Sequence, residues 1–385
     1  MLFKRMFNIG FALIIISAVL LGCAPAAEET GEIEEIEEVV IGVYEPMTGA
    51  QAAGGVQTMQ GVDLAYAQKD EVLGVPIRMV LVDNRGDKAE SATAMTRLIE
   101  QENAVAVVGS YGSSNSMAGG EVSEMAGVPV MGCSPTNPLV TEGKEYYFRA
   151  CFIDPFQGRV MAKYATEQGF EKVAIIQNIS QDYSVGLAAF FKQSWIELMG
   201  SEEGIVSETS YQDGDQDFTA QLSDIGDAEA IFAPGYYGDA ALLMKQAREM
   251  GFTGLFMGTD AWEAPELVDI GGSAAEGAVF SSHYSAEAAT TTASAPFVEA
   301  FKAEYGEAPS AMAALGYDAY MLAIDAIEKA GSFDRDAIRD AMAATENFEG
   351  VTGYITINET GDAVKDAVVL EVRDGEFKYI STVSP

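Results

Sequence analysis

The chain has 385 residues, with 59 acidic and 22 basic side chains and a formal net charge of −37 at pH 7. Nucleic acids and anionic lipid headgroups are bound largely through Lys and Arg, so this charge argues against both as partners. The chain has a single histidine, His283. This argues against metal sites built from several histidines and against most Ser-His or Cys-His catalytic systems.

Residues 1–22 are predicted to be an export signal. Two basic residues precede an apolar run at 11–21 that is too short for a settled membrane-spanning helix. The following Leu-Leu-Gly-Cys sequence resembles a bacterial lipobox, which implies cleavage before Cys23 and acylation of that cysteine. The alternative is an uncleaved anchor helix with a chance cysteine beside it. Both interpretations place the bulk of the chain outside the cytoplasm.

An acidic segment follows the predicted anchor. It carries seven glutamates and no basic residue, so its charges repel one another and remain solvated. Residues 23–38 are therefore predicted to be a lipidated tether between membrane and folded protein. The remaining 350 or so residues exceed the size at which one core usually stops growing, which predicts two domains.

The first half of the folded region alternates short apolar runs with amphipathic stretches. Strands are predicted at 39–44, 77–82, 104–108 and 128–131, and helices at 56–68, 89–101 and 117–125. The rhythm restarts after Pro155, with strands at 173–177, 205–210, 230–233, 255–257 and 278–281, and helices at 157–167, 184–199, 217–224, 239–250 and 264–270. Such alternation predicts α/β architecture with two doubly wound parallel sheets.

The pattern becomes helical near residue 294. Helices are predicted at 295–305, 311–330 and 335–345, and strands at 354–357 and 367–372. A helical block cannot bury its apolar faces alone, so we expect it to pack back on the first sheet. The first lobe is then discontinuous, with 39–153 plus 284–351, and the second lobe has 154–283 plus 352–385.

Other chemistry finds little support. No phosphate-binding P-loop or dinucleotide fingerprint is present, so no cofactor is expected. Asp213, Asp215 and Asp217 alternate as in a calcium loop, but the required glycine and glutamate are missing, and we interpret them as a solvated turn without metal. Cys133 and Cys151 either form a disulfide or remain two buried thiols, because spacing alone does not establish geometry.

Two loops rich in small hydroxyl residues follow strands of the first lobe. The loop at 110–116 precedes a helix, whose N-terminus favours negative charge, and the loop at 133–138 follows the next strand. Open parallel sheets bind ligands at the carboxyl ends of their strands. These loops therefore predict a carboxylate-binding edge.

These loops, together with other short stretches, resemble the periplasmic branched-chain amino acid binding proteins. The resemblance covers about 39–375 and rests on the order and spacing of the stretches at 83–84, 148–149, 182–186, 235–237, 257–260, 316–319 and 351–355. It implies a type I periplasmic binding fold, in which three crossover segments join two lobes that close on an amino acid. No catalytic residue is implied.

The resemblance also implies roles for individual residues. Ser113 and Thr136 would bind the ligand carboxylate, and Ser134 would add main-chain contacts. Asp260 would face the ligand ammonium, while Tyr183 and Tyr236 would close over the ligand from the second lobe. Taken singly, these serines and Asp260 are also suited to capping helices. The implied pocket wall comprises Tyr111, Gly112, Ala53, Trp262 and Ala313.

The function implied by the resemblance is capture of an amino acid, branched-chain or otherwise apolar. The protein would be a lipid-anchored monomer that delivers this ligand to an ABC permease and its ATPase subunits. Two alternatives remain at this point: a sensor lobe that binds an amide or aromatic acid, and an extracellular hydrolase on a two-lobed scaffold. The lone His283 disfavours the hydrolase.

Overall fold

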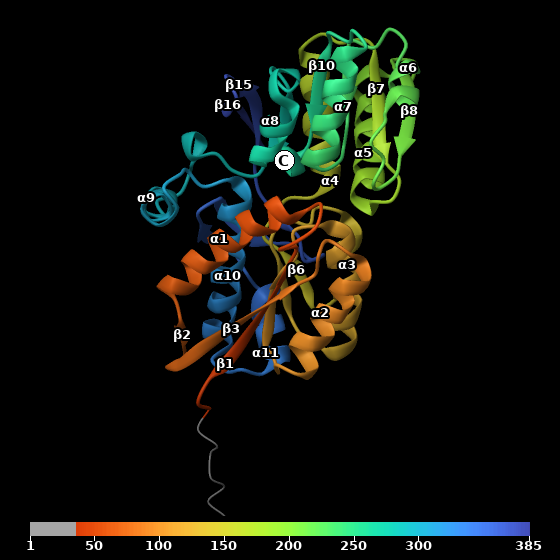
Figure 1. Cartoon of the computed structure of the whole chain (residues 1–385). Coiled ribbons are helices and arrows are strands. Elements are labelled where there is room, and N and C mark those ends of the chain that lie inside the picture. Colours follow the sequence, from red (N-terminus) through yellow and green to blue (C-terminus); the bar gives the residue numbers. More distant parts are fainter. Residues whose placement is uncertain (1–35) are drawn as a thin grey trace, which may run out of the picture. The chain divides into compact units, whose positions relative to one another are not determined.

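The computed structural model describes residues 36–385, so the predicted export signal and Cys23 lie outside the described residues. Six strands form the first sheet, in the order β2-β3-β1-β4-β5-β6. Figure 1 labels β1, β2, β3 and β6 of this sheet. Their bounds are Glu71–Val72 for β2, Val75–Asp83 for β3, Val39–Glu45 for β1, Ala106–Gly109 for β4, Val130–Gly132 for β5 and Tyr147–Arg149 for β6. All pairs are parallel except β2 with β3.

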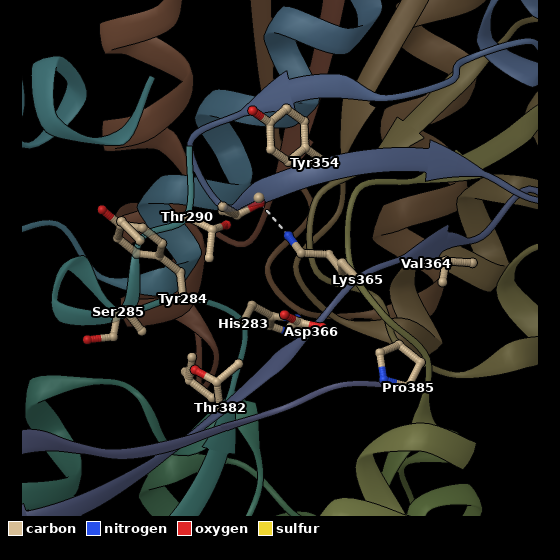
Figure 2. Close-up of a pocket in the computed structure, with 15 residues that line it drawn as sticks. His283, Tyr284, Ser285, Thr290, Tyr354, Val364, Lys365, Asp366, Thr382 and Pro385 are labelled. Atoms are coloured by element: carbon tan, nitrogen blue, oxygen red, sulfur yellow. Dashed lines mark hydrogen bonds between the residues drawn. The ribbon is translucent and has the colours of Figure 1, made fainter. Parts of the chain in front are cut away.

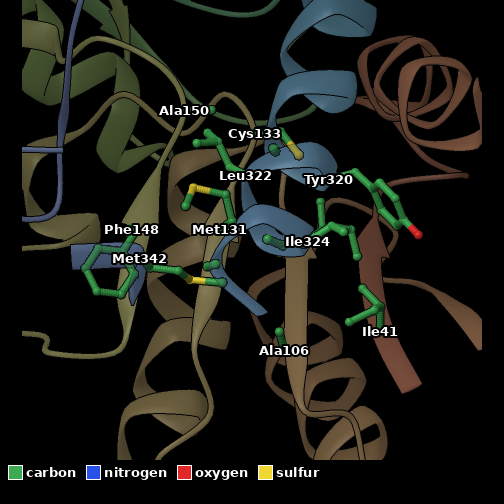
Figure 3. Close-up of a cluster of buried hydrophobic side chains, with 14 of the residues drawn as sticks. Ile41, Ala106, Met131, Cys133, Phe148, Ala150, Tyr320, Leu322, Ile324 and Met342 are labelled. Carbon is green, nitrogen blue, oxygen red and sulfur yellow. The ribbon is translucent and has the colours of Figure 1, made fainter. Parts of the chain in front are cut away.

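Helices cover the first sheet. They are α1 (Ala52–Gln68), α2 (Lys88–Glu100) and α3 (Ser113–Ala126), joined by α10 (Ala311–Ala330) and α11 (Arg335–Ala343) from the C-terminal part of the chain. Leu322 of α10 packs in one apolar cluster with Ile41 and Met131 of the sheet (Figure 3). The helical block thus packs back on the first sheet, as expected, because only there can it bury its apolar side.

Helix α1 begins earlier than the sequence predicts. Gly54 and Gly55 lie within it, although glycine disfavours helix interiors. A Cβ at Gly55 would lie 2.1 Å from the Pro46 carbonyl oxygen, and one at Gly61 would lie 1.7 Å from that of Ala313 in α10. These glycines therefore allow close backbone approach, which outweighs their local propensity.

Seven strands form the second sheet, in the order β16-β15-β11-β10-β9-β7-β8. Their bounds are Glu376–Val383 for β16, Ala367–Arg373 for β15, Val279–Ser282 for β11, Leu255–Gly258 for β10, Ala230–Phe232 for β9, Val173–Asn178 for β7 and Ile205–Tyr211 for β8. β15 and β16 pair antiparallel at one edge. Strand β16 was not predicted from the sequence, because its residues are exposed or half-buried and show little alternation.

The second sheet carries its own set of helices. They are α4 (Asp154–Glu167), α5 (Asp182–Met199), α6 (Thr219–Ser223), α7 (Tyr237–Glu249) and α8 (Pro265–Gly271), while α9 (Ser294–Tyr305) lies between β11 and α10 in the chain. Both sheets are dominated by parallel pairs with intervening helices. This arrangement confirms the predicted α/β class. Within residues 36–385, every helix is too short or too polar to cross a membrane.

Three crossing segments join the lobes: 150–153 after β6, 283–293 after β11 and 365–366 before β15. The last crossing lies later than the expected boundary between 351 and 352. A small sheet of β12 (Phe348–Gly350), β13 (Gly353–Ile357) and β14 (Ala363–Val364) precedes it. Ile355 and Ala363 pack in the core cluster of the first lobe, so these strands belong there.

Cys133 and Cys151 are free thiols, and both are buried in the core of the first lobe. Of the two alternatives that the sequence left open, the structure has the pair of buried thiols. Burial raises the pKa of each thiol above its ordinary value. Both side chains therefore act as small apolar groups.

Candidate ligand-binding site

The two hydroxyl-rich loops lie side by side at the carboxyl ends of β4 and β5. Ser113 begins α3, and its Oγ accepts a hydrogen bond from the Asn137 amide at 3.2 Å. The Ser134 hydroxyl donates to the Tyr111 carbonyl oxygen at 3.2 Å. These bonds join the loops, so Ser113, Ser134 and Thr136 share one buried region.

The Thr136 side chain differs from its neighbours. It is fully buried, and its Oγ1 makes no hydrogen bond of normal geometry among residues 36–385, although its hydroxyl lies near enough to Asp154 to oppose the rise in the pKa of that carboxyl group. A buried hydroxyl without a partner costs free energy, on the order of 1–3 kcal/mol. Thr136 thus offers an unused hydrogen bond at the sheet edge that the sequence predicted.

Arg149 holds the loop that carries Thr136. Its Nη1 donates to the Pro135 and Asn137 carbonyl oxygens at 2.7 and 2.8 Å, which brackets Thr136 on both sides. Its Nε lies 2.7 Å from the Asp362 carboxylate, and the Arg149 side chain is fully buried. The stretch that contains Arg149 contributed to the family resemblance, but nothing local indicated this role, since its partners are distant in sequence.

Asp260 lies at the start of a short helical turn after β10 and is buried. Its Oδ1 accepts hydrogen bonds from Gln157 Nε2 and the Tyr183 hydroxyl, both at 2.6 Å. Its Oδ2 lies 3.0 Å from His283 Nε2. A carboxylate oxygen can accept two hydrogen bonds, so Oδ2 retains capacity for one more donor.

The charge of this cluster follows from its contacts. Burial by itself raises the pKa of Asp260, but hydrogen bonds from His283, Tyr183 and Gln157 outweigh burial and hold that pKa below its ordinary value. Burial also lowers the pKa of His283, which favours the neutral ring. The cluster therefore carries the single negative charge of Asp260, and it is complementary to one small cation.

Helix α4 brings two further polar side chains that the sequence analysis did not single out. Asp154 is fully buried, and neither of its carboxyl oxygens has a hydrogen-bond partner in the described part of the chain. Burial raises the pKa of Asp154 well above its ordinary value, and the nearby Thr136 hydroxyl opposes this only in part, so the neutral form of Asp154 is favoured. Gln157 Oε1 is likewise buried and unpaired within that part. The Asp154-Pro155 helix start was the only sequence signal.

Three tyrosines line the region between the loops and Asp260. The Tyr236 ring lies 5.7 Å from the Tyr111 ring and 5.6 Å from that of Tyr183, measured between centroids. A Cβ at Gly112 would lie 3.1 Å from the Tyr236 hydroxyl, so glycine leaves room for that ring. The aromatic cluster thus joins Tyr111 of the first lobe to two tyrosines of the second.

The other expected wall residues lie elsewhere. Trp262 is buried in the core of the second lobe, 6.3 Å from the Phe280 ring. Ala313 packs with Leu64 and Phe297 in a separate cluster. Met312, one residue earlier, packs instead with the three tyrosines, because the helical turn directs neighbouring side chains to different faces.

The lobes are joined by direct contacts, which we call the closing contacts. Asp182 of the second lobe pairs with Lys88 at 2.6 Å and accepts from the Ser114 hydroxyl at 3.0 Å. Asn137 Nδ2 donates to the Asp182 carbonyl oxygen at 2.9 Å. The Tyr237 hydroxyl accepts from the Ala53 amide at 3.1 Å, which places this wall residue between the lobes. The two lobes are therefore in direct contact.

Glu45 at the end of β1 supports the first loop from below. Its Oε2 accepts a hydrogen bond from the Tyr111 amide at 2.8 Å. Burial raises the pKa of Glu45 to about 8, against the opposing effects of the Tyr111 amide and the Cys133 thiol. The folded protein therefore holds this proton over a range in which the unfolded chain has released it.

Folding stability should reflect that difference. An unfolded glutamate releases its proton near 4.5, so between that pH and about 8 folding takes up a proton, and stability falls as pH rises. We expect Glu45→Gln to remove this slope. Urea unfolding measures the free energy of unfolding at pH 5 and at pH 8. Between these pH values, we expect it to fall by on the order of 3 kcal/mol more in wild type than in the variant. Equal losses would contradict the assignment, and exposed Glu100→Gln serves as the control.

Comparison with known proteins agrees with this architecture. The model of a family described as "Periplasmic binding protein" matches residues 38–376. The Leu/Ile/Val-binding protein homolog 2 of Brucella abortus is 28% identical over 353 residues, which cover 89% of this chain and 93% of the relative. The leucine-, isoleucine-, valine-, threonine-, and alanine-binding protein of Pseudomonas aeruginosa is 27% identical, with coverage of 85% and 87%.

Solved structures extend the comparison. A leucine binding protein, LivK, from Thermotoga maritima superposes with a TM-score of 0.87 at 43% identity, covering 90% of this chain and 99% of the other. The substrate binding protein LivJ of a branched-chain amino acid transporter from Streptococcus pneumoniae, in complex with isoleucine, gives a TM-score of 0.84 at 31% identity, with coverage of 90% and 100%. The expected resemblance and fold are confirmed.

Proposed function

Because the chain belongs to the periplasmic binding protein family, we propose that it captures an amino acid with a branched or otherwise apolar side chain between its two lobes. The observation that carries this proposal is the pairing of two complementary ends. Unused hydroxyl capacity lies at Thr136 in the first lobe, and a buried carboxylate lies at Asp260 in the second. A zwitterion matches both.

The carboxylate end of the ligand fits the first lobe. Thr136 Oγ1 is buried and makes no hydrogen bond of normal geometry among the described residues, and Ser113 stands at the start of α3, where backbone N–H groups favour an anion. Ser134 lies in the second of the two loops, two residues before Thr136. We infer that the hydroxyls of Ser113 and Thr136 donate hydrogen bonds to the carboxylate and that Ser134 contributes main-chain contacts.

The ammonium end fits the second lobe. Asp260 is ionised and buried, and its Oδ2 has room for one donor. Gln157 Oε1 and the Asp154 carboxyl group are further buried oxygens on the neighbouring helix. An ammonium group has three N–H donors, so these oxygens provide acceptors of the right kind.

The middle of the ligand would contact apolar groups. Met312 and the rings of Tyr111, Tyr183 and Tyr236 form one buried cluster. These apolar and aromatic groups suit an aliphatic side chain. Methionine also adapts its shape readily, so the cluster suits several branched ligands rather than one.

The proposed mechanism is closure of the lobes around the ligand. Ligand held by the first lobe is covered by the second, and the closing contacts form at the rim. Burial excludes water, which strengthens each polar contact with the ligand. The closed form would then be recognised by an ABC permease and its ATPase subunits.

The family supports a location outside the cytoplasm and a role in solute binding. We further propose that Cys23 is acylated and holds the protein to a membrane, and that it works as a monomer without bond chemistry. Mass spectrometry of the mature N-terminus tests the acylation, because it would show an acylated cysteine in place of an unmodified chain.

The ligand can be identified directly. Mass spectrometry of whatever co-purifies, followed by calorimetry over an amino-acid panel, should give the tightest binding with leucine, isoleucine or valine. The panel should include amides, urea and aromatic acids as competing ligand classes. Tight binding of one of those classes, with no response to any amino acid, would overturn the proposal.

Thr136→Val tests the carboxylate end. Valine keeps the volume but removes the hydroxyl, so we expect amino-acid binding to weaken about tenfold, by about 1.5 kcal/mol. The melting temperature of ligand-free protein should change little, because Thr136 Oγ1 makes no hydrogen bond of normal geometry among the described residues. Thr209→Val is a matched control, since its hydroxyl is also buried and unpaired there but lies in β8. A large loss of stability would indicate a purely structural role.

A further inference from the structure

A pocket with a volume of about 400 Å³ lies between the second and third crossing segments. The second crossing contributes His283, Ser285 and Thr290, and the third contributes Lys365 (Figure 2). In Figure 2 the Lys365 side chain extends from the third crossing toward the second. None of the proposed ligand contacts Ser113, Thr136 or Asp260 lines this pocket.

Lys365 is an unusual residue for such a position, because lysine is rarely buried without a carboxylate partner. It is only 5% exposed, and its Nζ is hydrogen-bonded to the Thr352 hydroxyl. Within residues 36–385 no carboxylate lies within 4.0 Å of this ammonium group. The ammonium has three donors, so hydrogen-bonding capacity remains for an anion.

The nearby acids are engaged or solvated. Asp318 accepts hydrogen bonds from the Val351 amide and from the amide and hydroxyl of Thr352. Asp366 lines the pocket but is exposed, so water screens its charge. Burial lowers the pKa of Lys365 to about 8, although Asp318 opposes this. The lysine therefore remains largely protonated at pH 7.

His283 forms another part of the pocket wall. Its ring is 2% exposed, and its Nδ1 is buried without a hydrogen-bond partner in the described region. Its Nε2 faces Asp260 on the other side. His283 therefore lies between the pocket and the proposed amino-acid site at Asp260.

We propose that this pocket is a binding site for a short-chain monocarboxylate. Lys365 would pair with the carboxylate, and Thr290 and Thr382 add hydroxyl groups to the pocket wall. The rest of the lining includes small and branched apolar residues: Ala288, Ala289, Val364, Val368 and Pro385. These suit an alkyl group of a few carbons. This site is separate from the proposed amino-acid site.

Binding can be measured with trifluoroacetate as the probe, by fluorine NMR line broadening on the full mature protein. The titration is run both without amino acid and with saturating leucine, which separates this site from the interlobe site. We expect broadening that isobutyrate competes away in both conditions. Absence of broadening in both would overturn the proposal. Loss only with leucine would assign the probe to the interlobe site and equally overturn it.

Variants locate the site. Lys365→Met keeps the length of the side chain and removes its charge, so the probe should bind at least tenfold more weakly. Lys245→Met, an exposed lysine in α7, is the charge-matched control. Ala289→Phe fills the pocket from an exposed position and should also abolish binding, which guards against misfolding of the lysine variant. Unchanged affinity in both pocket variants would exclude this location.

Discussion

Asp260→Ala is expected to weaken amino-acid binding by at least about 2 kcal/mol, the cost of leaving a buried ligand ammonium without its partner. The carboxylate is ionised and held by Gln157, Tyr183 and His283, so it is oriented before the ligand arrives. Isothermal titration calorimetry with leucine measures the loss. Unchanged affinity would remove Asp260 from the site.

A ligand without the amine sharpens this test. 4-Methylpentanoate lacks the ammonium of leucine but keeps its carboxylate and branched end. If Asp260 acts on the ammonium, wild type and Asp260→Ala should bind this analogue with similar affinity, although leucine distinguishes them strongly. Equal losses for both ligands would indicate that the variant disturbs the fold of the site instead.

Arg149→Met should destabilise the ligand-free protein by about 3–5 kcal/mol, since removing one partner of a buried ion pair strands the other. Asp362 would lose its cation, and the Pro135 and Asn137 carbonyl oxygens would lose their donor. Urea unfolding measures the change. Amino-acid affinity should also fall in the fraction that remains folded, because the loop around Thr136 is released.

Two controls separate these causes. Arg335→Met removes a half-buried arginine that donates to the Ala104 carbonyl oxygen, and we expect a loss of only about 1 kcal/mol. Adding Asp362→Asn to Arg149→Met should recover part of the loss if the stranded carboxylate causes it. If Arg149→Met alone is as stable as wild type, the proposed role of Arg149 is contradicted.

Much of the fold was predictable because strands and helices carry local signals. The apolar run at 39–44 became β1, and the helix expected at 311–330 has the same bounds in the structure. The start of α1 was wrong because Gly54 and Gly55 are required by distant backbone contacts, which local propensity does not reveal. The edge strand β16 was missed because its half-exposed residues give little periodicity.

The candidate site was predictable in part for a similar reason. Ser113 and Thr136 follow neighbouring strands that end at the same edge of the first sheet. Asp260 follows β10 of the second sheet, and its role was implied by the family resemblance. Gln157 and Met312 were missed, since only tertiary packing places them beside the other residues. The same holds for Ala313, whose neighbour faces the aromatic cluster while Ala313 itself packs against Leu64. Their roles as ligand contacts remain predictions.

In each of the two first-lobe loops, one residue lies in the proposed site and the next residue contacts the second lobe. Ser113 lies in the proposed site while Ser114 bonds Asp182, and Thr136 lies in the site while Asn137 bonds the Asp182 carbonyl oxygen. In both loops, the residue proposed to bind the ligand and the residue that contacts the second lobe are therefore neighbours in the chain. Ligand binding can therefore affect the contacts between the lobes directly, through adjacent residues. A permease that binds at these contacts would respond to whether the site is occupied.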